Sequence, residues 1–407
     1  MYSMIRIGLI KEGKVPADNR VALTPSQCRW VQTHYQVVKI SVQYSKDRCY
    51  ADSEYERAGV ELTNDLSHCD ILLGIKEVPV ADLIPNKTYL FFSHTKKKQP
   101  HNQKLMQALL EKKITLIDYE CLEHEDGQRI IGFGFFAGIV GAHNGMMVYG
   151  RRSGAYELGR VFEHKTFRNL IHTYFGLKIP NVKIAVTGSG RVAQGILEIM
   201  NLMQIREVEK EECLEREFTY PVYVHLKGSD LYERIDGTNY SRSDFHLNPH
   251  HFCSRFRNYT LATDILMNGV YWEPGIPRLF EKELATDPNF RIQVIADVTD
   301  DENGSVPINL GDQTIEDPVY GVHKVTLEKT APYMPYSIDV IAVGNLPNEL
   351  PRDASRYFGE QLIKHVFQDL LKGQSKVIEK ATIIKNGKLT EDYQYLEGYA
   401  AGEVTNL

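Results

Sequence analysis

The stretch Val182–Glu209, VKIAVTGSGRVAQGILEIMNLMQIREVE, constrains the fold of this chain more than any other. A short apolar run leads into a turn that contains Gly188 and Gly190, where the backbone carries no side chains. From Arg191 onward apolar residues recur at helical spacing, and another strand is expected at Ile205–Val208. A strand, a glycine turn, a helix and a second strand in this order are typical of a nucleotide-binding α/β unit.

The turn predicts a binding site for a pyrophosphate. Gly188 and Gly190 would let a phosphate approach the backbone, and the helix that begins near Arg191 and Val192 would direct its free N–H groups at it. Ala193 occupies the third glycine position, as the pattern allows. The alternative is an ordinary glycine turn between a strand and a helix. The amphipathic helix that follows favours the dinucleotide interpretation.

The second strand ends at an acid, which predicts the cofactor. Glu209 comes 21 residues after Gly188, where the dinucleotide pattern expects a carboxylate that accepts the ribose 2′-hydroxyl. This favours NAD. The adjacent Lys210 could meet a 2′-phosphate, so NADP is possible.

Composition narrows the class of partner. The 407 residues are 43% hydrophobic and 25% charged, as in ordinary globular proteins, and the net charge of −6 offers no basic field for nucleic acid or an anionic membrane. The six cysteines lie far apart, without the spacing of a disulfide framework or metal site. We expect a cytoplasmic protein that has a small-molecule substrate and no metal, because no apolar segment is long enough to span a membrane and no signal peptide is recognisable. The oligomeric state cannot be inferred.

Strands and helices alternate in the first third of the chain, which predicts a parallel sheet. The expected strands are Ile5–Ile10, Val37–Val42, Ile71–Ile75, Thr88–Phe92 and Ile114–Ile117. Thr24, Pro25 and Gln27 have the pattern of a capping box that begins a helix.

Ionisable residues follow three of these strands directly. Lys76 and Glu77 come after the first of the three, His94 after the second, and Asp118 and Glu120 after the third. Ligands of open parallel sheets bind beyond the carboxyl ends of the strands, so we expect these side chains to converge. In the same way, Asp297 after the strand expected at 294–296 is interpreted as a cofactor or substrate contact.

The glycine-rich segment 132–154 predicts a closely packed helix that crosses between two domains. We therefore expect two doubly wound, Rossmann-like α/β domains with a cleft between them. The first comprises 1–140 and is completed by 350–407, where a long amphipathic helix ends at Gly373. Asn386 and Gly387 then predict a small hairpin between Ile383–Ile384 and Leu389. The second, 141–349, is the dinucleotide-binding domain.

The chain resembles the lysine-forming saccharopine dehydrogenases, including the lysine–ketoglutarate reductase half of the bifunctional lysine-degrading enzyme of animals. It is more distantly similar to alanine dehydrogenase and the proton-translocating transhydrogenase. The likeness spans nearly the whole chain, and the segments that carry it are KEGKVPADNRVALTP, GIKEVP, YLFFSHTKKKQ, LIDYE, FGFFAG, VTGSGRVAQG, NGVYWE, IADVTDDENGS and NLPNELP. The glycine turn is closer to the animal reductase, which is similar to a NADP user, whereas Glu77 follows the NAD-dependent yeast type.

The resemblance implies a role for individual residues. Lys76 and His94 match the acid–base pair of the family, and Arg20 and Arg129 match arginines that hold substrate carboxylates. The remaining matches surround the amino-acid substrate, at Glu77, Lys97, Gln99 and Glu120, or the nicotinamide and its ribose, at Asp297, Asn345, Leu346 and Pro347.

The implied reaction interconverts saccharopine with L-lysine and 2-oxoglutarate through a nicotinamide cofactor. The residue types suit it, because a buried lysine and a histidine can exchange protons near neutrality, and an arginine can grip a carboxylate through two N–H groups. An alanine or other amino-acid dehydrogenase is one alternative, and a catalytically silent NAD-binding sensor is another.

Overall fold

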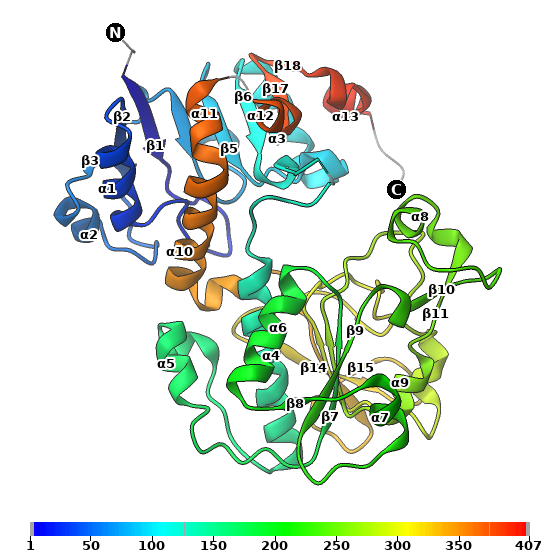
Figure 1. Cartoon of the computed structure of the whole chain (residues 1–407). Helices are drawn as coiled ribbons and strands as arrows, with labels where there is room; N and C mark the ends of the chain where they lie inside the picture. The colour runs from blue at the N-terminus through cyan, green and yellow to red at the C-terminus, as the bar shows by residue number, and fades with distance from the viewer. Residues whose placement is uncertain (1–3, 126, 374, 404–407) are drawn as a thin grey trace. The chain divides into compact units, whose positions relative to one another are not determined.

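The computed structural model describes residues 4–125, 127–373 and 375–403, and the chain divides into two compact units (Figure 1). Unit 1 comprises Met1–Phe133 and Pro351–Leu407, and unit 2 comprises Gly134–Leu350. Within the described residues each unit contains an eight-stranded, mostly parallel sheet. The expectation of two Rossmann-like α/β folds is thereby confirmed.

The sheet of unit 1 has the order β18-β17-β6-β5-β4-β1-β2-β3. Its strands are β1 (Ile5–Leu9), β2 (Val38–Gln43), β3 (Glu61–Thr63), β4 (Ile71–Leu73), β5 (Thr88–Phe91), β6 (Thr115–Asp118), β17 (Thr382–Lys385) and β18 (Lys388–Leu389). The strands from β3 to β6 are parallel, whereas β17 pairs antiparallel with β6 and with β18. Asn386 and Gly387 turn the β17–β18 hairpin with positive φ angles of 50° and 76°, as the sequence predicts.

Helices cover this sheet, and the capping box at its first helix is present as expected. The Thr24 hydroxyl accepts from the Gln27 N–H at 3.3 Å, and the Gln27 side chain accepts from the Thr24 N–H at 2.9 Å. The α-helices of unit 1 are α1 (Pro25–His34), α2 (Asp52–Arg57), α3 (Gln103–Glu111), α10 (Pro351–Leu362), α11 (Gln368–Lys372), α12 (Lys376–Ala381) and α13 (Glu397–Ala401). A π-helical segment, Ile363–Phe367, joins α10 to α11, and Gly373 ends the helix with φ +68°.

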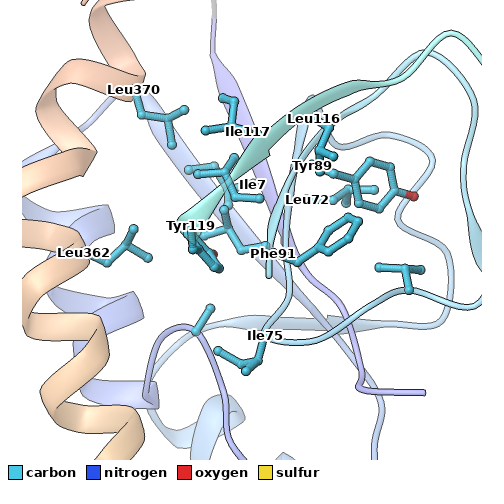
Figure 2. Packing of buried hydrophobic residues seen from close by; sticks show 14 of the residues in the cluster. Ile7, Leu72, Ile75, Tyr89, Phe91, Leu116, Ile117, Tyr119, Leu362 and Leu370 are labelled. Atoms are coloured by element: carbon cyan, nitrogen blue, oxygen red, sulfur yellow. The ribbon is translucent and has the colours of Figure 1, made fainter. Parts of the chain in front are cut away.

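The core of unit 1 is formed by residues from both ends of the chain. Figure 2 shows Leu362 and Leu370 beside Ile7 and Tyr119 of the sheet region. These side chains are buried, so the helix Pro351–Lys372 is held by its apolar face.

The sheet of unit 2 has the order β15-β14-β16-β13-β12-β7-β9-β8. Its strands are β7 (Lys183–Thr187), β8 (Arg206–Glu207), β9 (Val222–Leu226), β12 (Ile265–Asn268), β13 (Val294–Asp297), β14 (Val319–His323), β15 (Lys329–Thr330) and β16 (Ser337–Ile341), and β10 (Tyr232–Arg234) pairs separately with β11 (Phe252–Ser254). The α-helices of unit 2 are α4 (Gly134–Ser153), α5 (Phe167–His172), α6 (Arg191–Leu202), α7 (Lys210–Glu215), α8 (Arg242–Leu247) and α9 (Arg257–Ala262).

The strand order of unit 2 does not follow the order of the strands in the sequence. The strand after α6, β8, is not the neighbour of β7, because β9 lies between them. At the other side of the sheet β16 ends at Ile341, because Ala342 leaves the ladder and its carbonyl accepts from the Gln313 N–H at 2.7 Å.

Two glycines let α4 and α6 cross closely in unit 2 (Figure 1). A Cβ atom on Gly138 would lie 2.0 Å from the Val192 carbonyl oxygen, and one on Gly195 would lie 2.0 Å from the Phe135 carbonyl oxygen. Gly195 therefore packs directly on the backbone of α4. The glycine-rich composition of 132–154 is explained by this contact.

We predict that Gly195→Leu destabilises unit 2 by at least ~2 kcal/mol, because backbone atoms of α4 cannot move aside as a flexible side chain could. Denaturant unfolding of the purified variant measures the change. Gln194→Ala, at the exposed neighbouring position of α6, is the matched control and should unfold as the wild type does. Equal stability of the two variants would contradict the close helix crossing.

Candidate functional site

Ionisable side chains follow three neighbouring strands of unit 1. Lys76 and Glu77 lie just beyond β4, His94 beyond β5, and Glu120 beyond β6. Because β4, β5 and β6 are parallel neighbours, these residues share one edge of the sheet.

Glu77 and His94 form a hydrogen-bonded pair. The His94 Nδ1–H donates to Glu77 Oε1 at 2.5 Å, and Lys14 Nζ lies 3.3 Å from Glu77 Oε2. Burial raises the pKa of Glu77, but the hydrogen bond and charge of His94 outweigh it and lower this pKa to about 2. Glu77 is therefore an anion at neutral pH that fixes the imidazole, and the His94 Nε2 atom is left for proton exchange.

Lys76 is a partly buried amine, and its surroundings disfavour the protonated form. Burial, followed by the charges of Arg20 and Lys14, lowers the pKa of Lys76 to about 8. Its ammonium makes no hydrogen bond or ion pair with any residue that the structure describes. Lys76 can therefore be present in both protonation states near neutrality.

Glu12, which sequence analysis missed, holds the backbone that carries Lys76. Its carboxylate oxygens accept from the Ile75 N–H at 2.7 Å and from the Lys76 N–H at 2.9 Å. Burial, and then the charge of Asp18, raise the pKa of Glu12 to about 8. The sequence signal for Glu12 is the long polar loop after β1, whose length exceeds what a turn needs.

Arg20 forms a bidentate ion pair with Asp18. Its Nε and Nη2 atoms lie 2.9 and 2.5 Å from the two carboxylate oxygens, and both side chains are almost completely buried. The guanidinium also lies 4.2 Å from the ring centroid of Phe133. Burial raises the pKa of Asp18, but the charge and hydrogen bonds of Arg20 outweigh it and lower this pKa to about 2. The predicted grip of Arg20 on a substrate carboxylate is untested, and here two of its N–H groups hold Asp18.

Glu120 is the centre of a second charged group. Arg129 Nη2 contacts Glu120 Oε1, and Lys97 Nζ lies 3.8 Å from the same oxygen. The other oxygen, Oε2, is buried without a hydrogen-bond partner among the described residues. The side chains of Lys97 and Arg129 are 48% and 41% exposed, so both cations can reach a ligand. Gln99 accepts at its carbonyl from the Tyr399 hydroxyl at 2.7 Å.

In unit 2 the glycine turn has the conformation that the sequence requires. Gly188 has φ +104°, and a Cβ atom there would lie 2.5 Å from the Gly269 carbonyl oxygen. Gly190 caps the twelve-residue α6, and the space that a Cβ would occupy is open. Arg191 and Val192 form the first turn of this helix. The turn thus fits the phosphates of a dinucleotide, which bind the free N–H groups of a helix N-terminus.

The predicted contacts near the nicotinamide lie at the end of β13 and in the turn that begins at Asn345. Asp297 is buried, and its oxygens accept from Asn268 at 2.8 Å and from Asn309 at 2.9 Å, so in this structure it orders neighbouring side chains. Leu346 and Pro347 are buried in a 3₁₀ turn that Asn345 precedes. Their contact with a cofactor stays a prediction.

Glu209 follows β8 and is exposed, and the neighbouring Lys210 Nζ lies 2.5 Å from Asp230 Oδ1. β9 separates β8 from the glycine turn, which the spacing along the sequence could not reveal. No helix among the described residues has the length and apolar character of a membrane span.

This chain is similar to proteins of two related groups, the alanine dehydrogenases and the saccharopine dehydrogenases. Residues 8–140 match the family described as alanine dehydrogenase/PNT, N-terminal domain. The mitochondrial alpha-aminoadipic semialdehyde synthase of Rattus norvegicus is 30% identical over 412 residues, which cover 88% of this chain and 44% of the synthase. The lysine-forming, NAD(+) saccharopine dehydrogenase of Emericella nidulans is 26% identical over 395 residues, which cover 92% of this chain and 95% of that protein. The chain thus spans less than half the length of the synthase.

Two solved structures share the fold. An L-alanine dehydrogenase has a TM-score of 0.66 at 16% identity and covers 98% of this chain and 100% of its own. A transhydrogenase from Sinorhizobium meliloti has a TM-score of 0.58 at 14% identity, with 95% and 98% covered.

We predict that Lys76 reacts with amine-directed reagents at a lower pH than other lysines. The deprotonated amine is the nucleophile, so the labelling rate of Lys76 should rise with a midpoint near pH 8, the value given above for its pKa. Exposed lysines should rise near their usual pKa of about 10.4. Peptide mass spectrometry after brief labelling over a pH series measures both, and a shared midpoint would contradict the burial of Lys76.

Proposed function

We propose that this chain is a member of the saccharopine dehydrogenase family and an oxidoreductase that interconverts saccharopine with L-lysine and 2-oxoglutarate. The observation that carries the proposal is the pair of proton-exchanging groups at adjacent strand ends. Lys76 has a pKa of about 8, and His94 is fixed through Nδ1 by Glu77. A sensor that only binds a dinucleotide would not require this pair.

The reaction needs proton transfers that these residues can perform. In the direction of synthesis, the lysine ammonium must lose a proton, and the hydroxyl that leaves the carbon of 2-oxoglutarate must gain one. Lys76 in its neutral form can accept the first proton, and the Nε2 atom of His94 can donate the second. A bound nicotinamide cofactor would supply the hydride that reduces the imine. In the reverse direction the same groups exchange protons with water and the amine.

The charged group around Glu120 supports a substrate with several carboxylates. Arg129 and Lys97 are half-exposed cations, and they face one buried carboxylate. We assign them to the carboxylates of the substrate, and Glu120 to the placement of both cations. Arg20 is retained as a proposed contact of a substrate carboxylate, as the resemblance implies. Gln99 is proposed to contribute an amide to the amino-acid end.

The cofactor is proposed to bind at the turn formed by Gly188 and Gly190. The open space beside Gly190 and the position of this residue at the N-terminus of α6 support a pyrophosphate there. The sequence predicts NAD through Glu209, with NADP as the alternative because of Lys210. The cytoplasmic location predicted from the sequence likewise stays a prediction.

An assay of paired substrates tests the reaction. The protein is incubated with NADH or NADPH, with 2-oxoglutarate and each of lysine, ornithine and ammonia, and separately with pyruvate and ammonia. Loss of the reduced cofactor is followed by absorbance, and lysine with 2-oxoglutarate should be the best pair. Preference for pyruvate would select an amino-acid dehydrogenase, the alternative that the alanine dehydrogenase fold supports. Cofactor binding without turnover on any pair would select the sensor.

We predict that Lys76→Met and His94→Gln each lower turnover by about 10²–10⁴-fold, the usual contribution of general acid–base catalysis. Cofactor affinity should change little, because both residues belong to unit 1. Lys178→Met, at an exposed position of unit 2, is the matched control for loss of a lysine. An unchanged rate in Lys76→Met would refute the assignment of this residue.

Replacement of Glu77 by glutamine should act through His94. The amide keeps the size of the side chain but removes the carboxylate that accepts from the His94 Nδ1–H, so the imidazole loses the partner that fixes its orientation. Turnover should therefore fall, with a smaller loss of rate than in His94→Gln and with little change in cofactor affinity. An unchanged rate in Glu77→Gln would show that Glu77 does not act through His94.

A further inference from the structure

The strand beside the glycine turn of unit 2 is β9. Leu226, the last residue of β9, pairs with Thr187, the last residue of β7. The Gly188 N–H donates to the Leu226 carbonyl at 3.0 Å, and the His225 Nε2–H donates to the Gly188 carbonyl at 2.7 Å. The carboxyl end of β9 is therefore bonded directly to the turn that would hold the phosphates.

Glu209 is much farther from this turn. Its strand, β8, lies on the far side of β9, and neighbouring strands are about 4.8 Å apart, so β8 is displaced sideways by roughly 10 Å from β7. In addition, Glu207 pairs with Tyr223, so β8 ends short of the level that Leu226 reaches. The adenosine ribose is bonded directly to the pyrophosphate, and the end of the strand next to the glycine strand is where its 2′ position is read.

A charged turn, 227–230, follows β9 at this position. Asp230 Oδ1 lies 2.5 Å from Lys210 Nζ, and Asp230 Oδ2 accepts from the Lys227 N–H at 3.1 Å. The hydrogen bond with Asp230 raises the pKa of Lys210. Lys227 itself is exposed. Together the turn and Lys210 of α7 present one carboxylate, that of Asp230, and two cations, Lys210 and Lys227. Both oxygens of Asp230 accept hydrogen bonds from the protein.

Resting on the proposed function, we propose that the turn 227–230 binds the adenosine ribose of the nicotinamide cofactor and that the Lys210–Asp230 ion pair sets the response to a 2′-phosphate. Lys210 neutralises the carboxylate that would otherwise repel the phosphate, and Lys227 adds a cation beside it. Glu209 does not take part.

This placement reverses the expectation drawn from the spacing of residues. If Glu209 contacted the ribose, its charge would exclude NADP. Asp230 is paired with Lys210 and therefore allows the 2′-phosphate of NADP. In the proposed arrangement the two members of the ion pair act in opposite directions. The charge of Lys210 favours a 2′-phosphate, and the charge of Asp230 opposes it.

Binding of both reduced cofactors to the full chain tests the proposal. Dissociation constants for NADH and NADPH are measured by calorimetry for the wild type, Asp230→Asn, Lys210→Met and Lys227→Met. Asp230→Asn should tighten NADPH relative to NADH by about tenfold, and each lysine variant should weaken NADPH relative to NADH by about tenfold, the scale of one charge-assisted hydrogen bond. The double variant Lys210→Met/Asp230→Asn should return the ratio toward that of the wild type.

Two further variants separate this proposal from its alternatives. Lys178→Met controls for the loss of a distant lysine, and Glu209→Gln should change the NADH/NADPH ratio by less than about twofold, because salt screens an exposed charge at that distance. A large change in Glu209→Gln, with none in Lys227→Met or Asp230→Asn, would overturn the proposal. That result would leave the proposed reaction intact if saccharopine is still turned over. Failure to bind either cofactor would instead refute the proposed function.

Discussion

The candidate site depends on the burial of charged side chains beyond the ends of the strands in unit 1. Burial removes water from these side chains, so each charge needs an opposite charge or a hydrogen bond nearby. Lys76 lies close to Arg20 and Lys14, and this environment is tolerable only because Asp18 and Glu77 supply opposite charges nearby. The carboxylates are not interchangeable. Asp18 and Glu77 each have a cationic or hydrogen-bonded partner that keeps them ionised, whereas Glu12 accepts from two backbone N–H groups and has a raised pKa. The same sheet edge thus holds acids of different strength.

Unit 2 depends on a contact of another kind, the approach of two helix backbones. Gly138 and Gly195 remove the side chains that would separate α4 from α6, and α6 carries the N–H groups that face the glycine turn. The position of the proposed phosphate site therefore depends on van der Waals contact between backbones rather than on charged residues. Neutral and close contacts of this sort change little with salt or pH, unlike the ion pairs of unit 1.

The sequence predicted features that depend on local pattern. The capping box of α1, the glycine turn after β7, the C-terminal hairpin and most strand positions follow from periodicity and turn chemistry, and they are present in the structure. Features that depend on pairing between distant segments could not be predicted. Strand order is one, since a short run such as 222–226 carries no sign of its neighbours. The burial of the Arg20–Asp18 ion pair could not be predicted either, because two polar residues so close in a loop could each face solvent.

The two-part composition of unit 1 has a consequence for how the protein is made. β6 pairs with β17, and the helix Pro351–Lys372 packs on the core of the same sheet, so the β6 edge and part of the apolar face stay uncovered until residues 351–385 have left the ribosome. At a synthesis rate of 5–20 residues per second, the intervening unit 2 occupies roughly 10 to 40 s. Unit 2 is continuous and can complete its own sheet during that interval. The nascent N-terminal strands must meanwhile be kept from association with other chains, which makes them the part of this protein most dependent on chaperones.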